Sequence, residues 1–141
     1  MQAGVGGNSK EVKVMPDFEE KAICRKVGGV FELSAIKGYE PIAFTKLWLN
    51  SKTADNLYRW DFHDVAQSKQ YLLHSIELEY GLKSEDAKAN EVKMSEVMYW
   101  GGYMFTYLSY QENIKPEDVL KAYDVERVLK CYDTLHTLSA G

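Results

Sequence analysis

The sequence predicts an all-α fold of six or seven helices, and three observations lead to that prediction. Apolar residues recur with helical spacing over residues 65–80, 95–111 and 125–138, and no run of β-branched residues alternates with period two. Cap-type residues, glycines and prolines stand at the ends of these runs. The 141 residues, 45% hydrophobic and 27% charged, suit one globular domain. We expect residues 15–141 to form that domain and the glycine-rich residues 1–14 to be a flexible tail.

The first helix is expected to begin after Asp17, a residue type that caps helices. Gly28-Gly29 interrupts it. Residues 30–36 then fit either a resumed helix or a short strand, because periodicity does not separate the two over so few positions. Residues 37–39 form a break.

Three helices are expected in the middle of the chain. The first starts at Glu40-Pro41, because proline at the first helical position has no hydrogen-bond donor to lose. The third ends at Gly81, which suits a left-handed cap. Their expected ranges are 41–50, 52–60 with Ser51 as its cap, and 65–80 after a polar elbow at Asp61 to Asp64.

The last third of the chain has the clearest helical pattern. After a polar, mobile connector over 82–93, the expected helices are 95–111 capped by Ser95, a short one over 115–123, and a final one from 125 capped by Asp124. In the long helix, the predicted core stripe is Val97, Trp100, Met104 and Leu108. Gly101-Gly102 costs on the order of 1–2 kcal/mol of helix propensity, so we expect close packing of a neighbouring helix or a kink there.

Tyrosines line another side of the same helix. Tyr99, Tyr103 and Tyr110 fall within roughly 40° of one another, with Tyr107 at their margin. They fit either a second layer of core or a groove that receives a protein partner. Because tyrosine suits interfaces and the chain has ten of them, we take these four as candidate partner-binding residues.

Charge and composition exclude several classes of function. Seventeen Lys and Arg against 21 Asp and Glu leave a net charge of -4, which disfavours nucleic-acid binding. No apolar run is long enough to span a bilayer and no secretory leader opens the chain, so we expect a cytoplasmic protein without membrane contact. Cys24 and Cys131 follow no disulfide or metal spacing and are expected to be reduced core residues.

No motif predicts catalysis, a cofactor or a metal, and we expect a protein that is not an enzyme. The alternative is a small metal-dependent or His/Asp-dependent enzyme that uses Asp61, His63 or His136. Helix capping accounts for the elbow residues, and Asp133 can hold His136 on the apolar face of the final helix.

A DNA-binding autoregulator is a second alternative. The helices expected over 116–123 and 125–138 are spaced like a helix-turn-helix unit, with Arg127 and Lys130 exposed on the second. The acidic balance of the chain and the apolar stripe on that second helix weaken this interpretation.

Three segments of the chain resemble a known family. The segments Glu96–Tyr110, Ile114–Leu120 and Cys131–Thr137 resemble those of small bacterial antitoxin-like proteins encoded beside ADP-ribosyltransferase toxins, and fainter similarity reaches back to Phe44. The resemblance implies a protein-binding module that neutralises a toxin by direct contact. We therefore expect a toxin-like protein partner or self-association, and no catalytic residues.

Overall fold

The computed structural model describes residues 18–83 and 91–132, and every regular element in these ranges is an α-helix. The all-α prediction is confirmed, with eight helices in the described ranges where six or seven were expected. They are α2 (Phe18–Ile36), α3 (Pro41–Leu49), α4 (Lys52–Tyr58), α5 (Phe62–Val65), α6 (Lys69–Tyr80), α7 (Val92–Glu112), α8 (Pro116–Ala122) and α9 (Val125–Lys130). The expected tail over 1–14, most of the expected connector and the final helix beyond 132 lie outside the described residues.

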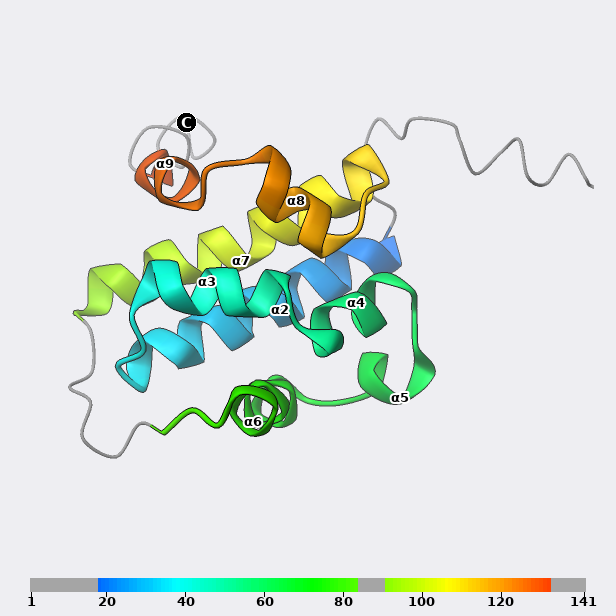
Figure 1. The fold of residues 1–141 in the computed structure, drawn as a ribbon, viewed down its shortest axis with the longest axis horizontal. Coiled ribbons are helices and arrows are strands. Elements are labelled where there is room, and N and C mark those ends of the chain that lie inside the picture. The colour runs from blue at the N-terminus through cyan, green and yellow to red at the C-terminus, as the bar shows by residue number, and fades with distance from the viewer. Residues whose placement is uncertain (1–17, 84–90, 133–141) are drawn as a thin grey trace, which may run out of the picture.

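Helices α2 and α7 form the centre of the fold. They run side by side along the long axis in Figure 1 and share a more extensive contact than any other pair of described helices. Helix α6 lies below this pair in that view, α8 and α9 lie above it, and α3 and α4 pass in front of α2. The side chains of α2 and α7 are therefore attached to the most closely packed pair of helices in the described part of the chain.

Glycines let the backbones of α2 and α7 approach each other. A Cβ atom on Gly28 would lie 2.9 Å from the carbonyl oxygen of Tyr99, and one on Gly102 would lie 2.8 Å from the carbonyl oxygen of Val27. Both distances are shorter than van der Waals contact, so neither position has room for a side chain. The crossing of the two helices thus depends on one glycine from each.

Both glycine pairs allow close packing against neighbouring helices, whereas the sequence predicts close packing only at Gly101-Gly102. The close packing expected at Gly101-Gly102 is confirmed. The interruption expected at Gly28-Gly29 is wrong, because α2 continues through both glycines, and residues 30–36 are helix rather than strand. The glycines weaken the helix locally, but the contact with α7 that they permit stabilises it.

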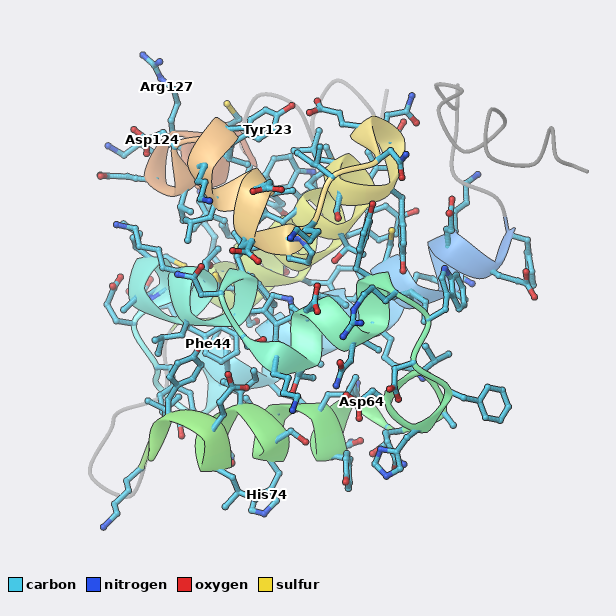
Figure 2. All side chains as sticks on the ribbon, turned by 45° about the vertical axis from the view of Figure 1, so that its right-hand side comes forward. Phe44, Asp64, His74, Tyr123, Asp124 and Arg127 are labelled. Carbon is cyan, nitrogen blue, oxygen red and sulfur yellow. The ribbon has the colours of Figure 1, made fainter. Side chains whose placement is uncertain are left out.

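Aromatic rings fill the core between α2 and α3. Phe31 is fully buried and meets Phe44 edge-on, with ring centroids 5.3 Å apart, and Trp48 at 5.9 Å. Figure 2 shows Phe44 pointing from α3 into the interior. Edge-to-face pairs of this kind add to the stabilisation from burial.

The core face of α7 differs from the predicted one. The four residues of the predicted stripe are only half-buried, namely Val97, Trp100, Met104 and Leu108. The buried residues of the helix are Met98, Gly101, Gly102, Phe105, Ser109 and Tyr110. Because α7 is apolar on nearly every side, its own pattern does not indicate which side meets α2.

Most predicted helix ends are confirmed by side-chain caps. Glu40, Ser51 and Asp124 each accept hydrogen bonds from backbone N–H groups in the first turn of α3, α4 and α9. Pro41 occupies the first position of α3, and Gly81 ends α6 in the left-handed conformation with φ +66°.

Two predicted helix starts are wrong. Helix α7 begins at Val92, and the Ser95 hydroxyl, expected as its cap, instead donates to the Val92 carbonyl inside the helix at 2.7 Å. The helix expected over 65–80 begins later, at Lys69, and the elbow before it forms the separate short helix α5. Asp61 caps the short α5, and Ser68 caps α6.

Candidate functional site

Three of the four candidate tyrosines are half-buried on α7: Tyr99, Tyr103 and Tyr107. None of their hydroxyl groups makes a hydrogen bond to a residue that the structure describes. A half-exposed tyrosine offers a flat apolar ring and a polar tip, the kind of surface that protein interfaces favour. These three residues remain candidate contact residues.

The ring of Tyr99 rests directly on the backbone of α2. A Cβ atom on Gly28 would lie 3.1 Å from both Cε2 and Cζ of that ring. Any residue other than glycine at position 28 would therefore push the ring away. The glycine that allows the helix crossing also fixes the direction of Tyr99.

Tyr103 lies beside the first half of α2. Burial raises the pKa of its hydroxyl above the ordinary value, and nearby Cys24 adds to this rise, while the positive charge of Arg25 acts in the opposite direction. The hydroxyl of Tyr103 is therefore protonated at neutral pH and can donate a hydrogen bond. Arg25, which is exposed, is a cation close to this tyrosine.

Tyr99 and Tyr103 border a surface hollow of about 330 Å³. Its described lining residues are Glu32, Glu96, Tyr99, Trp100, Tyr103 and Tyr132. Trp100 and Tyr132 meet edge-to-face with ring centroids 5.8 Å apart. The hollow thus combines four aromatic rings with two carboxylates.

Sequence reasoning missed four of these lining residues. Trp100 was assigned to the core, and Glu32, Glu96 and Tyr132 come from outside the predicted tyrosine set. One signal was present in the sequence: positions 96, 99, 100 and 103 have the i, i+3, i+4, i+7 spacing of a single helix face. The contributions of α2 and of the segment that follows α9 depend on tertiary packing.

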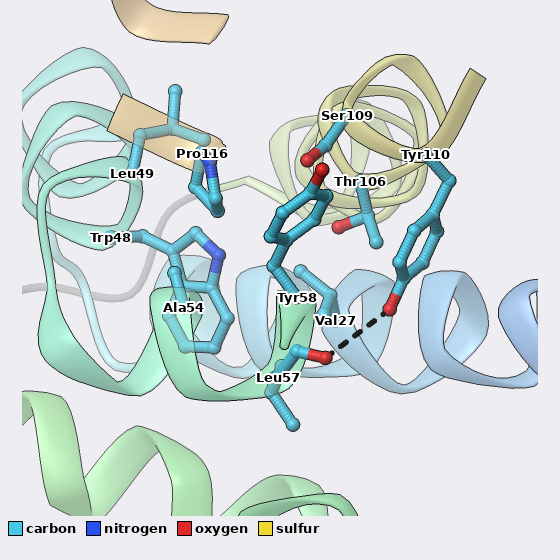
Figure 3. A pocket seen from close by; sticks show the side chains of 10 residues that line it. All are labelled: Val27, Trp48, Leu49, Ala54, Leu57, Tyr58, Thr106, Ser109, Tyr110 and Pro116. Carbon is cyan, nitrogen blue, oxygen red and sulfur yellow. Dashed lines mark hydrogen bonds between the residues drawn. The ribbon is translucent and has the colours of Figure 1, made fainter. Parts of the chain in front are cut away.

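Tyr110, the fourth candidate, lies in the core and is therefore not part of the proposed contact surface. Only 5% of it is exposed, and its hydroxyl donates to the Leu57 carbonyl at 3.4 Å. Its ring stacks with Tyr58, with centroids 6.0 Å apart, and with Trp60, at 6.3 Å. Figure 3 shows the hydrogen bond to α4. Helix α4 and the turn after it therefore cover this end of the tyrosine stripe.

The cavity in Figure 3 is too small for an organic ligand. It holds about 20 Å³ between Trp48, Leu57, Thr106, Tyr110 and their neighbours. That volume suits about one water molecule, whereas ligand pockets usually hold several hundred Å³. We interpret it as a packing defect of the core beside Tyr110.

A larger hollow of about 590 Å³ lies where α3, α7 and α9 meet. Its floor includes the apolar side chains of Ile42, Met94 and Leu129. Its rim carries both signs of charge, with Glu40, Glu91 and Glu126 beside Lys93 and Lys130. Three acidic and two basic side chains leave only a small charge excess, so the hollow has no strong preference for a charged ligand.

The polar elbow at Asp61 to Asp64 has a structural role. Asp61 caps α5, and the buried Asp64 accepts hydrogen bonds from Asn56 at 2.9 Å and His63 at 3.0 Å. In Figure 2 Asp64 lies beside α4, whereas His74 extends away from α6. No group of three metal-ligating side chains occurs within residues 18–83 and 91–132, and His136 and Asp133 lie outside those ranges.

The helix pair α8–α9 exposes charges of both signs. Arg127 and Lys130 are exposed as predicted, and Figure 2 shows Arg127 pointing outward. Lys130 forms an ion pair with Glu126 at 3.1 Å, and Asp124 lies on the same surface. A phosphate-binding surface needs a positive excess, and this one has two acids for two bases.

The two cysteines are free thiols in different surroundings. Cys24 is fully buried, and burial, helped by the nearby Glu20 carboxylate, raises the pKa of its thiol to about 12. Cys131 is half-buried. A thiol with so high a pKa has almost no thiolate at neutral pH, so Cys24 is chemically inert in the folded chain.

We expect a thiol reagent to modify one cysteine rapidly in the native protein and both after unfolding in urea. The thiolate is the reactive form, and only Cys131 is partly accessible. Mass spectrometry of the digested protein identifies the modified site. Cys131→Ser should leave no rapidly reacting thiol, and rapid native modification of Cys24 would contradict the burial described above.

Comparison with known proteins gives no family or function for this chain. No family model, no curated protein and no solved structure matches the chain. Over residues 18–83 and 91–132, no helix has the length and apolar character needed to cross a membrane.

Proposed function

We propose that this chain is a protein-binding module that contacts its partner through Tyr99, Tyr103 and Tyr107. The observation that carries the proposal is the hollow beside Tyr99 and Tyr103, where half-exposed aromatic rings gather next to the most closely packed pair of described helices. Aromatic side chains that are already held in place lose little conformational freedom on binding, so they make strong contacts.

We further propose that the partner is a toxin and that the chain acts as its antitoxin or immunity protein. The support for this part is the resemblance of Glu96–Tyr110 and the later segments to antitoxin-like proteins. The net charge of -4 suits a protein that covers a basic or substrate-binding surface of a toxin. The balanced charge on α8–α9 gives the DNA-binding alternative no comparable support.

The test is co-expression with the product of the adjacent reading frame, followed by calorimetry of the purified pair. We expect relief of growth arrest and a stable complex. Tyr99→Ala and Tyr103→Ala should each weaken the complex by roughly 1–3 kcal/mol, as hot-spot aromatics do. Both variants should remain folded by circular dichroism.

Tyr71→Ala is the matched control, because Tyr71 is 42% exposed on α6 and lies outside the hollow. It should bind like the unaltered chain. Failure to rescue growth or to form a complex, with both proteins soluble, would contradict the proposed function. Sedimentation of the chain alone over a range of concentrations separates binding of a partner from self-association.

A further inference from the structure

The hollow beside the tyrosines has the composition of a site for a cation. Six described residues line it, four of them aromatic, and the charged ones, Glu32 and Glu96, are both acidic. Neither carboxylate forms an ion pair with a residue that the structure describes. Aromatic faces attract cations through their quadrupole, and unpaired carboxylates add a direct charge interaction.

Helices α2 and α7 and the segment that follows α9 build this hollow, and their packing fixes its walls. Helix α7 supplies Glu96, Tyr99, Trp100 and Tyr103 from one face. Helix α2 supplies Glu32, one turn after the glycine on which the Tyr99 ring rests. The wall is therefore formed before any ligand arrives.

The third wall comes from Tyr132, two residues after the end of α9. A Cβ atom on Gly101 would lie 2.6 Å from Cδ2 of Leu129, so this glycine lets α9 approach α7 closely. Tyr132 follows Leu129 by about one turn and reaches Trp100 edge-on. The glycine pair of α7 thus serves both neighbours, Gly102 facing α2 and Gly101 facing α9.

We propose that this hollow binds the side chain of an arginine presented by the protein partner. This inference rests on the proposed protein-binding function and names the group that the site recognises. A guanidinium is planar and weakly hydrated, so it stacks on aromatic rings, and its five N–H donors can reach carboxylates on two different helices. The ammonium of lysine is compact and strongly hydrated, and it suits a shallow aromatic hollow less well.

One cation of the chain itself bears on this site. Arg25 acts on the hydroxyl of Tyr103 from α2 but does not line the hollow. The positive charge of Arg25 repels an incoming guanidinium, and its side chain is exposed to solvent. Replacing it with a neutral residue, Arg25→Gln, should therefore strengthen binding of a cation rather than weaken it.

The test is a nuclear magnetic resonance titration of the full chain with three blocked tripeptides at low ionic strength. Glycine flanks arginine, lysine or citrulline, the last being a neutral mimic of arginine with nearly the same shape. We expect saturable shifts of the Trp100 indole and of the Tyr99 ring with the arginine peptide. Binding should be weaker with lysine and weakest with citrulline.

Carboxylate variants test the charge directly. Glu32→Gln and Glu96→Gln should each weaken binding of the arginine peptide by roughly 2- to 5-fold, the range found for exposed ion pairs. The fold should be unchanged. Glu117→Gln is the matched control, because Glu117 is exposed on α8 and lies outside the hollow. It should bind the peptide like the unaltered chain.

Equal binding of citrulline, or no saturable shift with any peptide, would overturn the cation site. Equal binding of lysine would overturn the choice of arginine. These outcomes are separate from failure of the proposed function. If the partner complex depends on Tyr103 but no peptide binds, only this inference fails. If the arginine peptide binds but Tyr103→Ala leaves the partner complex unchanged, only the proposed contact surface fails.

Discussion

Replacing Gly28 and Gly102 together with alanine is expected to destabilise the fold by roughly 1–4 kcal/mol, because overpacking at two sites costs about 2–6 kcal/mol. Each added methyl group would meet a backbone carbonyl oxygen at 2.8–2.9 Å, so the two central helices must move apart. The gain in helix propensity, about 1 kcal/mol for each glycine, offsets only part of this cost. Urea unfolding followed by circular dichroism measures the free energy of unfolding.

Gly29→Ala is the matched control for this prediction. Gly29 neighbours Gly28 in the same helix, but its added Cβ atom would meet only the Lys69 side chain, at 2.7 Å from Cδ. A lysine side chain can rotate away, so this variant should keep or slightly raise the stability of the chain. If the double variant were as stable as Gly29→Ala, the close crossing of α2 and α7 would be disproved.

Tyr110→Ala is expected to lower the free energy of unfolding by roughly 3–5 kcal/mol, as removal of a large buried aromatic side chain does. The substitution removes the ring that stacks with Tyr58 and with Trp60, and it enlarges the small cavity beside it. Tyr110→Phe keeps the ring and loses the hydrogen bond to the Leu57 carbonyl, so its cost should stay below about 1.5 kcal/mol. Thermal and urea unfolding measure both effects.

Tyr103→Ala provides the contrast within the same helix. Tyr103 is half-buried, so its truncation should cost clearly less stability than that of Tyr110. Equal destabilisation by the two alanine variants would mean that Tyr103 belongs to the core as firmly as Tyr110. The proposed contact surface would then be wrong.

The fold class and most helix ends follow from local signals in the sequence. Apolar spacing and caps such as Ser51, Asp124 and Gly81 act within one turn of their helix, so the residues themselves carry the information. Gly28-Gly29 misled the prediction because its effect is not local. Glycines usually weaken a helix, but these face another helix that only a glycine allows to approach.

The candidate site could be predicted only in part. Tyr99, Tyr103 and Tyr110 share one side of α7 in the helical pattern, and no local signal separates them. Tyr110 differs from the other two because α4 and the turn after it cover its side chain. In that turn Trp60 takes a left-handed conformation with φ +62° and stacks on Tyr110. Glu32 and Tyr132 join the hollow through packing between helices that are distant in sequence.

Hydroxyl-radical footprinting of the chain, alone and with the product of the adjacent reading frame, tests whether the partner covers Tyr99 and Tyr103. Aromatic side chains react readily, and mass spectrometry reads each position separately. We expect the partner to lower modification of Tyr99, Trp100 and Tyr103 several-fold, while Phe62 and Tyr71, which are exposed on α5 and α6, react as before. Protection of Phe62 and Tyr71 with no change at Tyr99 and Tyr103 would contradict this expectation.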